Sequence, residues 1–90
     1  MIYGIYSIRD VCSGYLPITL DISDAVAERN FEHACVSTKD SLFFTHPDDY
    51  SLMKLGTFDS EHGTFDLLPH PKRLLCASDC IAVAKGRGVL

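Results

Sequence analysis

The sequence predicts a small α+β protein in which a β-sheet of about three to four strands, antiparallel or mixed, packs against one main α-helix. Three observations support this fold class. The chain begins with a β-forming segment, one amphipathic helix follows it, and two later strand-like segments are joined by a glycine-containing turn. The expected order of elements is strand, helix, short strand and then the two strands of a hairpin.

The first strand is predicted over residues 2–8, where isoleucine and tyrosine predominate. Side chains alternate between the two faces of a strand, so Tyr3 and Ile5 are expected on one face. The other face is expected to carry Ile2, Tyr6 and Ile8. Because both faces are apolar, this strand is predicted to lie in the interior of the sheet.

The main helix is predicted over residues 23–36. Asp21 and Ser23 are both suitable N-cap residues, since their side chains can accept a hydrogen bond from the first helical N–H groups. At the helical repeat, one broad stripe is apolar and is expected to pack on the sheet; it comprises Val26, Ala27, Phe31, Ala34 and Cys35.

The second half of the chain is predicted to form a hairpin. Residues 42–44 favour a short strand or a packed loop, and Pro47 favours a turn or a one-turn helix. Strands are expected over residues 51–58 and 64–68, and Pro69 and Pro71 are expected to end the second of them. The folded domain is therefore predicted to span 1–71, with 72–90 as a basic tail that is flexible or weakly helical.

The charge of the chain is low and uneven. The 90 residues carry a net charge of −4, which argues against a non-specific nucleic-acid binder. Residues 72–90, however, hold four basic side chains and one carboxylate, so the tail is suited to contact phosphate. No apolar run approaches the ~20 residues of a membrane span, and no secretion signal is present, so we expect an intracellular protein that does not bind membranes.

The cysteines are expected to be reduced thiols in such a compartment. For two of them, Cys76 and Cys80, a metal site or a disulfide stays open as an alternative, because both sulfurs can lie on one helix face. No cofactor or metal is predicted. The chain also lacks a phosphate-binding loop, a nucleophile elbow and a zinc-protease motif, so we expect that it is not an enzyme.

The aromatic residues give the best indication of function. Tyr3, Tyr6 and Tyr15 lie near Arg9, and Phe58 lies near Lys54. Exposed aromatic rings beside basic groups are typical of proteins that stack on the bases of single-stranded nucleic acid. The structural alternative is that these rings form the core of a small sheet protein.

Three segments of the chain resemble a known family. They are MIYGIYSIRD at residues 1–10, DAVAERNF at 24–31 and PDDYSLMKLGTFD at 47–59, the last running into an EHG turn. Together they resemble the small nonstructural protein of gokushovirus-type Microviridae, the isometric single-stranded-DNA bacteriophages. The resemblance covers about residues 1–71.

The resemblance implies a DNA-binding accessory protein in the host bacterial cytoplasm, acting on the single-stranded genome in replication or packaging. We expect a homodimer that gathers basic groups into one stripe, with Tyr3 or Tyr6 stacking on bases. The candidate contacts are Tyr3, Tyr6, Arg9, Arg29, Lys54, Lys72 and Arg73. In the alternative reading of these residues, Arg29 pairs with helix acids and Lys54 only solvates a strand face.

A protein–protein module is the second functional hypothesis. It would bind the phage replication protein, the procapsid or a host factor through an acidic stripe of the helix or through an exposed strand edge. That stripe consists of Asp24, Glu28 and Glu32, spaced four residues apart on one side.

Overall fold

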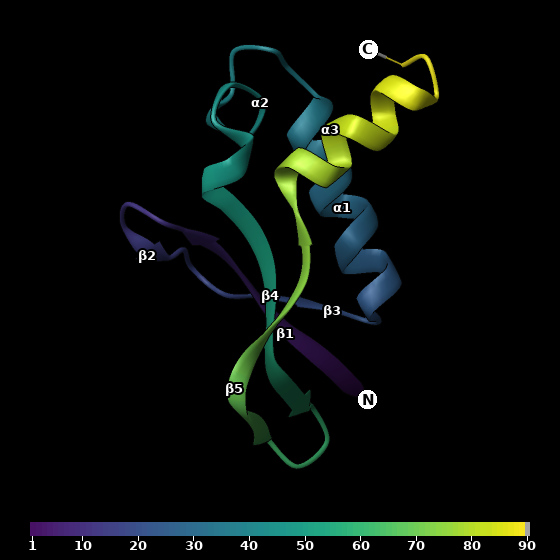
Figure 1. The fold of residues 1–90 in the computed structure, drawn as a ribbon. Coiled ribbons are helices and arrows are strands. Elements are labelled where there is room, and N and C mark those ends of the chain that lie inside the picture. Colours follow the sequence, from purple (N-terminus) through teal and green to yellow (C-terminus); the bar gives the residue numbers. More distant parts are fainter. Residues whose placement is uncertain (90) are drawn as a thin grey trace.

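The computed structural model describes residues 1–89, and its central element is a five-stranded antiparallel sheet (Figure 1). The strand order is β2–β1–β4–β5, and β3 also pairs with β1 on the edge that β2 occupies. The strands are β1 (Ile2–Asp10), β2 (Gly14–Tyr15), β3 (Thr19–Asp21), β4 (Tyr50–Asp59) and β5 (Thr64–Cys76). The helices are α1 (Asp24–Val36), α2 (Leu42–Thr45), the 3₁₀ turn η1 (Pro47–Asp49) and α3 (Ala77–Gly86). The prediction of an α+β fold is confirmed.

The helices pack on one face of the sheet. The core joins Tyr6, Tyr50 and Leu52 of the strands to buried residues of α1 and α3, with Ile8 and Leu75 packed against it. These strand residues point to the same side, since Ile8 pairs with Leu52 and Leu52 pairs with Leu75 across neighbouring strands. We call this side the helix face.

Helix α1 begins where its N-cap was predicted. The Ser23 hydroxyl oxygen accepts a hydrogen bond from the Val26 N–H, and Asp24 adds a negative charge to the first turn. Three residues of the predicted apolar stripe, Ala27, Phe31 and Cys35, are buried against the sheet and α3. The helix is therefore held by both its cap and its packing.

Residues 42–44 are helical, neither a strand nor a loop. The Ser41 side chain accepts a hydrogen bond from the Phe44 N–H and so caps α2. The Phe43 ring lies edge-on to Phe31 and Tyr50, with ring centroids 6.0 and 4.8 Å away. This aromatic packing stabilises a single helical turn that is too short to be stable alone.

The predicted boundary at residue 71 is corrected by the structure. Strand β5 continues through both prolines to Cys76. Residues 68–71 form an insertion opposite Leu55 and pair with no residue of β4. Strand β5 is also an edge strand, so the missing N–H groups of the two prolines are tolerated there. The expected tail then forms α3, whose Cys80 and Ile81 are buried, so 72–86 belong to the folded domain.

The sheet is strongly coiled and the molecule is elongated. A Cβ atom on Gly56 would meet the Asp66 carbonyl oxygen and come within 2.8 Å of the Leu67 Cα, so β4 and β5 cross closely there. The radius of gyration is 13.8 Å, whereas a compact chain of this length has about 12 Å. Figure 1 shows the β4–β5 hairpin extending away from α2 and α3.

Candidate nucleic-acid interface

The strands present a second face, which points away from the helix face and which we call the opposite face. Its membership follows from the paired register, because directly paired residues point to the same side. The predicted alternation in β1 agrees with this register. The opposite face comprises Tyr3, Ile5, Ser7, Arg9, Tyr15, Leu20, Ser51, Met53, Gly56, Phe58, Phe65, Leu67, Arg73 and Cys76.

Charge is divided sharply between the two faces. Among the paired strand residues, Arg9 and Arg73 are the only charged side chains of the opposite face. The strand carboxylates fall on the helix face, and they are Asp10, Asp21, Asp59 and Asp66. A chain of net charge −4 therefore has one sheet face whose only strand charges are positive.

The two arginines lie at the same end of the opposite face. Arg9 pairs with the half-exposed Tyr15 on one side and with Ser51 on the other, while Arg73 pairs with Met53. Strand β4 separates them, so their Cα atoms lie roughly 12 Å apart by strand geometry. Both side chains are exposed, and within residues 1–89 neither guanidinium lies within ion-pair distance of a carboxylate. We call Arg9, Tyr15 and Arg73 the arginine end.

The other end of the opposite face is apolar. Tyr3 pairs with Phe58, which pairs with Phe65, and the two phenylalanine ring centroids are 5.0 Å apart. Leu20 and Leu67 lie in the neighbouring row, on either side of Ile5 and Gly56. We call Tyr3, Leu20, Phe58, Phe65 and Leu67 the apolar end. Tyr3 and Arg9 are six residue steps apart along β1, about 20 Å in an extended strand.

Three predicted contacts lie on the helix face instead. Tyr6 is 0% exposed, and its hydroxyl donates a hydrogen bond to Asp24 Oδ1 over 2.6 Å. Lys54 Nζ lies 2.9 Å from the same oxygen, and Lys72 pairs with Lys54 across the strands. The Tyr6 ring is thus not available to stack on a base, and this part of the prediction is corrected.

The Tyr6–Asp24–Lys54 cluster ties α1 to the sheet. Hydrogen bonds from Tyr6 and Lys54 hold the pKa of the Asp24 carboxyl below its ordinary value, so the carboxylate stays charged. Burial, together with the bond to Asp24, raises the pKa of the Tyr6 hydroxyl. These groups satisfy one another internally, which indicates a structural role.

The remaining candidates lie on α1. Arg29 is exposed, but it lies on α1 and not on the opposite face of the sheet. It lines a surface groove together with Val83 and Arg87 of the α3 region. In the acidic stripe proposed as a partner site, Asp24 is already paired with Lys54. Glu28 and Glu32 are partly exposed. The structure therefore brings together Tyr3, Arg9 and Arg73 of the predicted set on one face.

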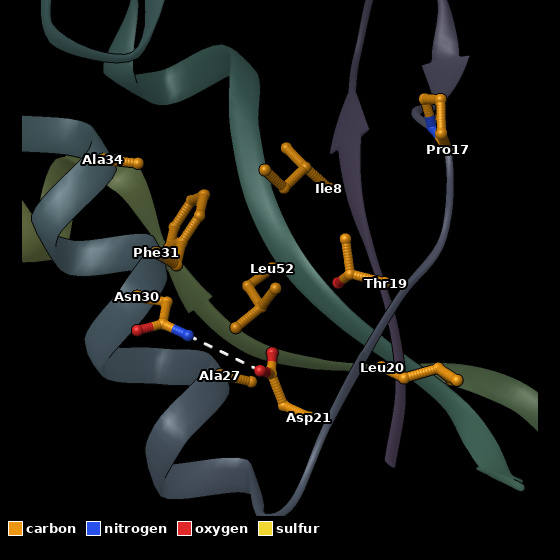
Figure 2. Close-up of a pocket in the computed structure, with 10 residues that line it drawn as sticks. All are labelled: Ile8, Pro17, Thr19, Leu20, Asp21, Ala27, Asn30, Phe31, Ala34 and Leu52. Carbon is orange, nitrogen blue, oxygen red and sulfur yellow. Dashed lines mark hydrogen bonds between the residues drawn. The ribbon is translucent and has the colours of Figure 1, made fainter. Parts of the chain in front are cut away.

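A cavity of about 390 Å³ lies between α1 and β3, with Ile8, Phe31 and Leu52 at its floor (Figure 2). Its one internal polar contact is the 3.5 Å bond from Asn30 Nδ2 to Asp21 Oδ1. Neither lysine nor arginine lines it, so the cavity lacks the groups that bind phosphate. Figure 2 also shows Leu20 turned away from α1, as its place on the opposite face requires.

The cysteines are free thiols in the structure, and two of them belong to the core. The neighbouring Cys35 thiol and burial raise the pKa of Cys80, which keeps it protonated and unreactive. Cys76 lies at the N-cap of α3. Within the described part of the chain, no three metal-ligating side chains converge.

None of the helices formed by residues 1–89 combines the length and apolar character that crossing a bilayer requires.

The family model of the Phage ORF5 protein matches residues 3–80. This match includes β1 from its second residue, the other four strands, helices α1 and α2, and the start of α3. The chain therefore belongs to the Phage ORF5 protein family. Neither a curated protein nor a solved structure matches it significantly.

Proposed function

We propose that this phage protein is a non-enzymatic accessory protein that binds single-stranded DNA through the arginine end of its sheet. The setting we propose is a microvirus infection, in the cytoplasm of the host bacterium, during replication or packaging of the genome. The observation that carries the proposal is the division of charge between the faces, which leaves Arg9, with Tyr15 beside it, and Arg73 on a face without a strand carboxylate.

The chemistry of these side chains suits a single strand. An arginine fork donates paired hydrogen bonds to phosphate oxygens, and an exposed tyrosine offers a face on which any base can stack. Ser51 and Met53 lie between the arginines in the paired register, and both are uncharged, so no carboxylate separates the two guanidinium groups on this face. This platform is small, so we expect moderate affinity and little sequence preference.

Binding to a labelled single-stranded oligonucleotide, followed by fluorescence anisotropy, tests this function. We expect salt-sensitive binding at low ionic strength, because phosphate contacts release counterions. A duplex of the same sequence should bind more weakly, since its bases are not free to stack on Tyr15. Absence of single-strand binding at low salt would contradict the proposal, and equal affinity for duplex would remove the role of stacking.

A further inference from the structure

We infer that the apolar end of the opposite face is the interface of a homodimer. Its most exposed members are Phe65 at 62%, Leu67 at 64% and Leu20 at 45%. They form a contiguous surface with the partly exposed Tyr3 and Phe58, because the five residues occupy two adjacent rows of the same sheet face.

The area of this surface is suited to a small dimer. With about 150–250 Å² for a whole aromatic side chain, the apolar end exposes on the order of 500 Å². That is at the upper limit of what a monomer normally leaves in water. Two copies face to face would bury roughly 1,000 Å², the smallest total that specific interfaces usually show.

Because the apolar end carries no charge, a second copy of the same chain is the partner that fits it. No member of the apolar end is charged, and the nearby strand carboxylates Asp21, Asp59 and Asp66 point to the helix face. Two-fold packing of this surface on itself would therefore bury neither a lone charge nor two like charges. An oppositely charged partner would find nothing to pair with.

The shape of the chain points the same way. The hairpin end of the sheet extends from the helical part, and the molecule measures 43 × 27 × 18 Å (Figure 1). An extended sheet end whose apolar side chains are largely exposed gains from packing against a second sheet. The arginine end lies about 20 Å away along β1, so a dimer would leave both copies free to bind DNA.

Sedimentation equilibrium, without DNA, tests the dimer independently of the proposed function. We compare Leu67→Asp with Leu42→Asp, since Leu42 is an equally exposed leucine, at 59%, on α2. The wild type and Leu42→Asp are expected to have the mass of a dimer at high micromolar concentration. Leu67→Asp is expected to be a folded monomer, with its dissociation constant raised at least tenfold.

Circular dichroism verifies that each variant is folded, and Leu20→Asp on the other edge of the apolar end serves as a second variant. The inference is overturned if the wild type is monomeric at the highest concentration, which would assign the surface to a different protein partner. It is equally overturned if the folded Leu67→Asp and Leu20→Asp variants both stay dimeric.

Discussion

Replacing Arg9 and Arg73 together by glutamate is expected to weaken binding of single-stranded DNA at least about 100-fold. A hydrogen bond to a charged group contributes about 1.5–3 kcal/mol, and 1.4 kcal/mol corresponds to a tenfold change in affinity. Both residues are exposed and belong to no ion pair within residues 1–89. Their replacement should therefore leave the fold intact and remove the phosphate contacts.

The matched control is the Arg29→Glu, Lys39→Glu double variant. It changes the net charge by the same amount, but both residues are exposed on or just beyond α1, away from the opposite face. General repulsion from DNA is thus equal in the two variants, and the difference between their affinities measures the contribution of the face. Equal losses in the two variants would show that only net charge matters.

Gly4→Ala is expected to destabilise the fold by about 3 kcal/mol, from overpacking and a broken hydrogen bond. A Cβ at this position would meet the Tyr6 Oη and come within 2.6 Å of its Cε2. The ring is fully buried and bonded to Asp24, so it cannot yield without leaving the core. This is a large fraction of the roughly 5–13 kcal/mol that stabilises a domain of this size. Urea denaturation measures the loss.

Gly86→Ala is the control for this substitution. No atom lies within 4 Å of a Cβ placed there, and Gly86 ends α3, so alanine is expected to be neutral or to stabilise slightly. Tyr6→Leu should reduce the further cost of Gly4→Ala, because the clashing ring is gone. If the stability losses of Gly4→Ala and Tyr6→Leu simply add, or if Gly4→Ala destabilises no more than Gly86→Ala, a Cβ at residue 4 does not clash with the Tyr6 ring.

The first half of the fold could be predicted from the sequence because its signals are local. The alternation in residues 2–8, the Ser23 cap and the stripe ending at Cys35 each act within one element. Pro69 and Pro71 misled the prediction for a non-local reason. Their missing N–H groups are tolerated only because β5 is an edge strand with an insertion there, which depends on its pairing with β4.

The candidate site was predicted in part. Arg9, Arg73 and Tyr3 share a face, but their register across β1, β4 and β5 depends on bulges near Lys54 and Leu52 that no local pattern reveals. Tyr6 carries the same local signals as Tyr3, yet the space above Gly4 admits its ring to the core. Tyr15 lies near Arg9 in the sequence but is not among the predicted contacts, because only the β1–β2 pairing places the two residues side by side.

The most direct test of the central claim, that DNA lies on the opposite face, is the salt dependence of single-strand binding in Arg9→Gln and Arg73→Gln. The slope of log affinity against log salt changes by about 0.7 for each phosphate contact on a single strand. We predict that each substitution reduces the steepness by about that amount, and that Arg29→Gln leaves it unchanged. Slopes equal to that of the wild type in both Arg9→Gln and Arg73→Gln would contradict the claim.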